Sequence, residues 1–269
     1  MKTYQKQKQS IKVLFLGLCT LIISAISALS AKAAIITFSD STFNDEDWNR
    51  TSFLQGNAQV VTGNQITSGE NQFRQIIHTL YPDPGMTSYA IGFHQQIGAV
   101  YNPQLQGAIS SLDYSENSIL FGGYYNGQTT GIALKQDGKV YSFGVGVTPE
   151  SNWTTKSVQN LQEGDFNLIG KVPEDLGLAS TVAPVDFGSG TEHPDFSSTG
   201  SPIEFGFFRS NSNCTTCGPY KIIAGIDNWS VTVNTEEQET TPVPEPTSTV
   251  GMLVLVAIAL FNYKHQRRS

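Results

Sequence analysis

The chain of 269 residues has few charged residues, cysteines and histidines. Only 14% of its residues are charged, and it contains 3 Cys and 4 His. A chain of this length can bury a substantial core, so disulfides are not needed to hold it together. With 39% apolar and 10% aromatic residues, the composition is globular and excludes disorder throughout.

Recognisable catalytic motifs are also missing. The sequence has no G-x-S-x-G nucleophile motif, and adjacent acids such as Glu174 and Asp175 are typical of solvated loops. Away from the chain ends the histidines are His78, His94 and His193. His94 alternates with apolar neighbours, which predicts a place on the polar face of a strand. We therefore predict no catalytic residues and a protein that is not an enzyme.

The first 33 residues have the layout of a secretory signal peptide. Basic residues precede an apolar stretch at residues 13–29, and Ala31-Lys32-Ala33 is a small-x-small cleavage motif. Cleavage between Ala33 and Ala34 would start the mature chain at residue 34. The alternative is an uncleaved N-terminal membrane anchor.

The last 28 residues, 242–269, form a second targeting signal. A Pro-rich spacer contains Pro244, Glu245 and Pro246, an apolar run at residues 250–261 is the length of a short membrane helix, and a basic end follows. A basic end stays cytoplasmic, which leaves the body of the protein outside.

This order of three parts resembles the PEP-CTERM sorting signal of exported bacterial proteins. The resemblance implies recognition of Pro244, Glu245 and Pro246 by an exosortase, a membrane-embedded processing protease. The protein would then be anchored in the inner membrane during sorting and finally reach the cell surface or the extracellular matrix. The alternative is a plain C-terminal anchor.

Between these signals lies a body of residues 34–241 that is strongly acidic. It contains 8 basic and 22 acidic residues, a net charge of −14. Such a surface repels phosphate backbones, so we expect no nucleic-acid partner.

The body has the sequence pattern of an all-β domain. Short apolar runs alternate with Gly, Asn, Ser and Thr, and Asp137-Gly138 separates two β-rich runs, which predicts a hairpin. We also predict a helical turn within residues 158–166. Further strands are expected at residues 35–38, 73–80, 89–94, 108–114, 119–124, 203–209, 221–224 and 229–233. About ten short strands in one domain predict a two-sheet β-sandwich.

Residues 38–48, 195–207 and 225–231 resemble a group of exported cyanobacterial PEP-CTERM proteins. The opening and closing segments also resemble jelly-roll carbohydrate-binding modules, which implies that the first and last strands pair. That resemblance further implies a structural Ca²⁺ held by Asp227 with Asp40 or Asp45, since Ca²⁺ prefers carboxylate and carbonyl oxygens. The alternative is that these residues only form turns through bonds to their own backbone.

Two further groups of residues are candidate sites. Cys214 and Cys217 are expected to form a disulfide at a hairpin tip, the alternatives being free thiols or a metal or redox site. Tyr124, Tyr125 and Trp153 are candidate ligand-binding residues, because sugars stack their C–H faces on aromatic rings.

The sequence thus predicts an exported, noncatalytic surface or matrix protein associated with polysaccharide. Trp48 and Trp229 are expected to fill the core instead of binding a ligand. The alternatives are a secreted enzyme acting on exopolysaccharide and a purely structural matrix component.

Overall fold

The structure is a computed structural model that describes residues 34–69, 71–123, 127–148, 152–173 and 180–236. These belong to one compact unit, Ala33–Glu236. The predicted signal peptide and the predicted sorting signal lie outside the described residues. Within the described part of the chain, no helix has the length and apolarity needed to cross a membrane.

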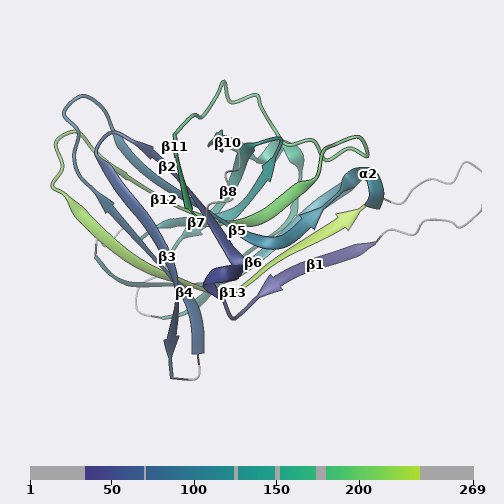
Figure 1. Cartoon of the computed structure of the whole chain (residues 1–269), viewed down its shortest axis with the longest axis horizontal. Coiled ribbons are helices and arrows are strands. Elements are labelled where there is room, and N and C mark those ends of the chain that lie inside the picture. Colours follow the sequence, from purple (N-terminus) through teal and green to yellow (C-terminus); the bar gives the residue numbers. More distant parts are fainter. Residues whose placement is uncertain (1–33, 70, 124–126, 149–151, 174–179, 237–269) are drawn as a thin grey trace, which may run out of the picture. The chain divides into compact units, whose positions relative to one another are not determined.

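Two sheets make up the body, as predicted for an all-β domain. The first, sheet A, has the strand order β3-β4-β13-β6-β9, and β1 pairs with the C-terminal half of β13. The first and last strands of the described body are therefore neighbours, as the jelly-roll resemblance implied (Figure 1). The strands of sheet A are β1 (Ile35–Asp40), β3 (Ala58–Ser68), β4 (Asn71–Leu80), β6 (Ile109–Gly123), β9 (Thr154–Leu161) and β13 (Tyr220–Thr235).

The second sheet, sheet B, has the order β10-β8-β7-β12-β5-β2-β11, in which β11 runs parallel to β2. Its strands are β2 (Trp48–Gln55), β5 (Ser88–Tyr101), β7 (Thr129–Gln136), β8 (Lys139–Val147), β10 (Asn167–Lys171), β11 (Ser180–Pro184) and β12 (Ile203–Asn213). Three short helices complete the described elements: η1 (Asp45–Asp47), α2 (Pro103–Gln106) and η2 (Glu163–Asp165).

The main core lies between the two sheets and is rich in aromatic side chains. Trp48 of β2 and Trp229 of β13 are 2% and 0% exposed, and their rings contact edge to face at 5.2 Å. Phe207 of β12 packs against Trp48 at 5.3 Å. The prediction that Trp48 and Trp229 are core residues is confirmed. Their burial joins the start of sheet B to the end of sheet A.

Sheet B also buries its other face, which a simple sandwich would leave to solvent. The peptide N–H of Asp186, just after β11, donates to the carbonyl of Ile169 in β10 at 3.0 Å, so the two edge strands of the sheet meet. The sheet thereby encloses a second, smaller core. Its members are Phe53, Ile91, Phe93, Ala133, Val140, Ile169, Ala183 and Phe208.

Several predicted strands are confirmed, and others prove to be parts of longer ones. The hairpin of β7 and β8 turns at Asp137 and Gly138, which both adopt positive φ. The predicted strands 108–114 and 119–124 are one continuous strand, β6, and strands 221–224 and 229–233 are both part of β13. A bulge in β13, with Asn228 at φ 49°, separates its two halves. The bulge interrupts the alternation of the sequence, so the two halves were predicted as separate strands.

The predicted helical turn within residues 158–166 is present as η2, a single 3₁₀ turn at Glu163–Asp165. Residues up to Leu161 continue β9. In that turn the side chain of Asp165 accepts a hydrogen bond from the peptide N–H of Gln162 at 2.8 Å. The edge strand β9 shows weak alternation because most of its side chains are exposed or half-buried.

An ion pair between Glu116 of β6 and Arg209 of β12 crosses the main core, and both side chains are fully buried. Arg209 Nη1 and Nη2 lie 3.1 and 3.2 Å from the two carboxylate oxygens of Glu116. Tyr114 and Thr130 donate to the same carboxylate at 2.5 Å, and Ser118 also donates to it. This pair therefore joins sheet A to sheet B with its carboxylate fully hydrogen-bonded.

The prediction that His94 lies on a polar strand face is wrong. His94 is fully buried and stacks on Phe207, with ring centroids 4.6 Å apart. His78 is also fully buried, and its Nδ1 lies 2.9 Å from Asn211 Oδ1. Burial, with Arg209 nearby, lowers the pKa of His78 to about 3, and burial, with Arg74 nearby, holds the pKa of His94 well below its usual value.

Glu116→Gln should destabilise the fold strongly, because it leaves the Arg209 charge buried without its partner. We expect a loss of about 3–5 kcal/mol in the free energy of unfolding, measured by urea denaturation. Glu192→Gln is the matched control, since its pair with Lys139 is partly exposed at 2.8 Å. The control should change stability by less than about 1 kcal/mol. Equal effects of the two variants would contradict the structure.

Stability should also fall as the pH decreases below 6.5. Both buried histidines are neutral in the folded protein, whereas unfolding restores the ordinary pKa of 6.5, so the unfolded state binds more protons. Each histidine should cost up to about 1.4 kcal/mol per pH unit between about pH 6 and 5. Urea denaturation across that range should show a shallower slope for His78→Gln. An unchanged slope would show that His78 is not buried in its neutral form.

Candidate glycan-binding face

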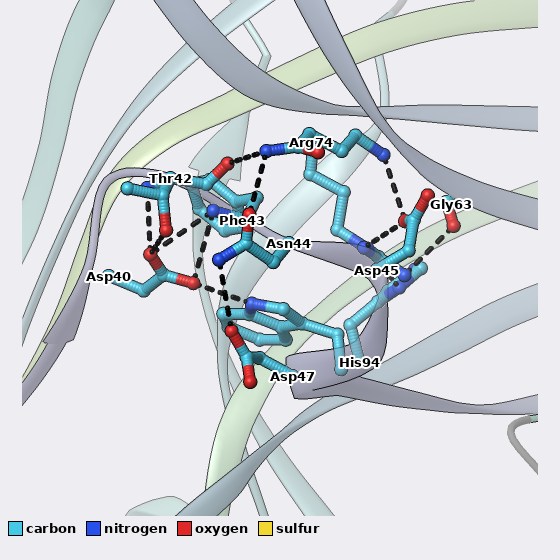
Figure 2. A network of polar contacts seen from close by, with 11 residues as sticks. Asp40, Thr42, Phe43, Asn44, Asp45, Asp47, Gly63, Arg74 and His94 are labelled. Atoms are coloured by element: carbon cyan, nitrogen blue, oxygen red, sulfur yellow. Dashed lines mark hydrogen bonds and ion pairs between the residues drawn. The ribbon is translucent and has the colours of Figure 1, made fainter.

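The predicted metal ligand Asp40 is engaged by the chain itself. Its carboxylate accepts hydrogen bonds from the peptide N–H of Thr42 at 2.7 Å, from the Thr42 hydroxyl at 2.8 Å and from the peptide N–H of Phe43 at 3.1 Å. The indole N–H of Trp48 donates to it at 2.7 Å (Figure 2). Burial alone would raise the pKa of Asp40, but these hydrogen bonds outweigh it and lower the pKa. Asp40 thus ties the end of β1 to the buried Trp48.

Asp45 and Asp227 are held in different ways. Asp45 lies in η1 and accepts from Arg74 Nη1 at 3.0 Å and from the peptide N–H of Gln65 at 2.9 Å (Figure 2). Asp227 accepts from the peptide N–H of Asn228 at 2.7 Å. Burial, and to a smaller extent the charge of Asp40, raises the pKa of Asp227.

These carboxylates fit a Ca²⁺ site poorly. Among the described residues, no three His, Cys, Asp or Glu side chains gather where they could hold a metal ion. Ca²⁺ takes six to eight oxygen ligands, whereas Asp40 and Asp45 already accept hydrogen bonds from protein donors. The turn formed by Asp40 and Thr42 matches the alternative in which Asp bonds its own backbone. The Ca²⁺ site stays a prediction for calcium titration to test.

Three aromatic side chains gather on the face of sheet A that points away from sheet B. Phe73 lies on β4, Phe121 on β6, and Trp153 immediately precedes the edge strand β9. Their ring centroids are 5.2 to 6.0 Å apart, so each ring contacts the other two. Phe121 and Trp153 are 46% and 38% exposed, whereas Phe73 is only 7% exposed. We call these three residues the aromatic platform.

Gly225 of the central strand β13 is what allows the platform to form. A Cβ atom at this position would lie 2.8 Å from Phe121 Cε2 and 2.9 Å from Trp153 Cη2, closer than carbon atoms can approach. Because the glycine has no side chain, rings from the neighbouring strands can lean over it. The platform therefore covers the middle of sheet A instead of lining its edges.

A row of polar side chains crosses the same face beside the platform. Asp227, two residues beyond Gly225 on β13, pairs in register with Asn117 of β6, which pairs with Thr155 of β9. The Thr155 hydroxyl lies 2.8 Å from Asn117 Oδ1. Exposed rings next to a carboxylate, an amide and a hydroxyl can stack on a sugar and bond its hydroxyl groups.

The structure thus places Trp153 and Asp227, which the sequence proposed for different roles, on one face. Tyr124 and Tyr125 lie outside the described residues, as do Pro244, Glu245 and Pro246 of the predicted sorting signal. Ala33 of the predicted cleavage site also lies outside the described residues. Ala34 is described, and its N–H donates to Thr235 Oγ1 at 2.7 Å.

Cys214 and Cys217 form a disulfide in the structure. The sequence predicted that it closes a hairpin tip, but β12 and β13 lie in different sheets, so the bridge closes a turn in the crossover between them. The turn is also closed by the peptide N–H of Cys217, which donates to the carbonyl of Cys214 at 3.4 Å.

Sequence reasoning missed Phe73, Phe121, Asn117 and Gly225. Phe73 directly precedes the buried Arg74, and Phe121 directly follows the buried Leu120. Because neighbouring side chains of a strand point to opposite faces, both phenylalanines lie on the outer face of sheet A. Apolar residues at outward positions of two strands were the available signal. That signal could be read only with the strands in register, because the two positions are 48 residues apart.

Neither a protein-family model nor a curated protein matches the chain. Among solved structures, the CBM22-1 xylan-binding domain from Paenibacillus barcinonensis Xyn10C aligns with 77% of this chain and 99% of that domain, at 12% identity and a TM-score of 0.30. A similarity this low does not assign a ligand to this chain.

Gly225→Ala should disturb the platform without unfolding the protein. The added methyl group must displace Phe121 and Trp153, which are partly exposed and have room to move. We expect greater quenching of Trp fluorescence by acrylamide. Gly122→Ala in β6 is the matched control, because a Cβ there meets no atom within 4 Å. Identical quenching in the two variants would show that Trp153 does not pack over Gly225.

Proposed function

We propose that this is an exported, noncatalytic protein of the cell surface or extracellular matrix that binds polysaccharide on the outer face of sheet A. The targeting patterns at both ends of the sequence support export and sorting by an exosortase-type protease. The net negative charge of the body argues against nucleic-acid binding, because it repels phosphate groups.

One observation carries the binding proposal, namely the aromatic platform with its adjacent polar row. Large aromatic side chains are normally buried, yet Phe121 and Trp153 remain 46% and 38% exposed side by side. They project from a sheet whose central strand has a glycine beneath them. Exposed aromatic clusters of this kind mark binding surfaces.

The described histidines do not favour the alternative of a hydrolytic enzyme. His78 and His94 are fully buried in the main core, where substrate cannot reach them. His193 Nδ1 lies 2.8 Å from the carbonyl of Phe166, which engages it in a loop. The buried carboxylate of Glu116 is fully engaged by Arg209 and its neighbours.

Trp153→Ala tests the proposal directly. We expect the full-length protein to bind at least one polysaccharide on an array, and the variant to lose affinity at least about tenfold, the equivalent of about 1.4 kcal/mol. Phe187→Ala is the matched control, because Phe187 is an exposed aromatic residue outside the platform, 48% exposed against 38% for Trp153. Absence of any glycan binding, or equal binding by both variants, would overturn the proposal.

A further inference from the structure

We propose that the aromatic platform recognises single residues of a soluble, uncharged glycan, and not a polyuronate or the flat surface of a crystalline polysaccharide. This inference rests on the proposed function and specifies the ligand class of the same site. Three features of the face carry it: the angles between the rings, the size of the cluster and the distribution of charge.

The ring planes do not form a flat strip. The plane of Phe73 is tilted by 37° to that of Phe121 and by 68° to that of Trp153, and the two exposed rings are nearly perpendicular, at 84°. A crystalline polysaccharide presents a plane of sugar rings and needs coplanar aromatic side chains to stack on it. Perpendicular rings instead form a corner, in which one sugar ring can stack on one aromatic face and touch the edge of the other.

The platform is also small. The centroids of Phe121 and Trp153 are 6.0 Å apart, comparable with the width of one sugar ring. Phe73 lies beneath them, nearly buried, and supports the two exposed rings. The polar row begins two residues from Gly225 along β13, about 7 Å at the rise of a strand, so its groups can reach the hydroxyls of the same or the next sugar.

The charge around the platform disfavours an anionic glycan. Arg50, Arg74 and Arg209 are the only arginines of the body, and all three side chains lie on the inner faces of the two sheets. Arginine is the side chain best suited to bind carboxylates in pairs of hydrogen bonds, and none is on the outer face of sheet A.

The nearest cation along the central strand is Lys221, four residues from Gly225, about 13 Å away at the rise of a strand. The charged member of the polar row is Asp227, and the body as a whole carries a net charge of −14. Lys156, three residues after Trp153, has its ammonium group beside Gly146 of sheet B and not on the outer face. A polyuronate would therefore meet repulsion on approach to the rings.

The test measures binding of the full-length protein to three classes of polysaccharide in parallel. The uncharged soluble probes are xylan, laminarin and dextran, the polyuronates are alginate and polygalacturonate, and the crystalline probe is microcrystalline cellulose. Each is tested with wild type, Trp153→Ala, Phe121→Ala and the control Phe187→Ala. Melting temperatures of all variants are measured first. Two platform variants are used so that the test can still be made if one of them does not fold.

The inference predicts that wild type binds at least one uncharged soluble glycan, and that both platform variants weaken this binding at least tenfold while the control does not. Binding to a polyuronate or to cellulose that is lost in the platform variants would overturn the inference but leave the proposed function standing. If no probe binds in a way that depends on Trp153 or Phe121, both the inference and the proposed function fail.

Discussion

The hydrogen bond from the peptide N–H of Asp186, two residues beyond β11, to the carbonyl of Ile169 in β10 brings the two edges of sheet B together, and the burial of both faces of that sheet depends on this closure. A sheet whose edges meet encloses one of its faces, so sheet B buries apolar side chains on both sides. Gly170 permits it, because a Cβ there would lie 2.6 Å from the Phe53 ring and 3.0 Å from the carbonyl of Pro184. The face of sheet A that points away from sheet B is then the broad sheet surface left for a ligand.

The space between the two sheets also contains buried polar groups. The space between the sheets combines a cluster of apolar aromatic residues around Trp48 and Trp229 with the ion pair of Glu116 and Arg209. A buried pair of this kind contributes little net stability, yet it is costly to break. The pair joins β6 of sheet A to β12 of sheet B and so helps to fix how the two sheets align.

Much of the fold could be predicted from the sequence, because its signals are local. The Asp137-Gly138 turn and the alternation within single strands depend only on neighbouring residues. The length of β13 could not be predicted, since the bulge at Asn228 breaks the alternation between Gly225 and Trp229. His94 was misplaced because alternation assumes one solvated face, whereas Phe93 lies in the second core of sheet B and His94 packs on Phe207 in the main core.

The candidate site was predicted only in part, for a similar reason. Trp153 could be identified from its residue type, because an exposed-looking Trp beside Asn is typical of a binding loop. Its partners Phe73 and Phe121 come from other strands, and only the register of β4, β13 and β6 brings them together. Asp227 was predicted as a metal ligand, a role that stays a prediction, and its place in the polar row beside the platform follows only from the register of β13 and β6.

The most direct test of this account is an NMR titration that follows the indole N–H signals of the three tryptophans. Xylohexaose and laminarihexaose are suitable uncharged ligands. The account predicts that the signal of Trp153 shifts with one of them, while those of the buried Trp48 and Trp229 stay in place. A glycan that binds while leaving the Trp153 signal unmoved would place the binding site elsewhere and contradict the account.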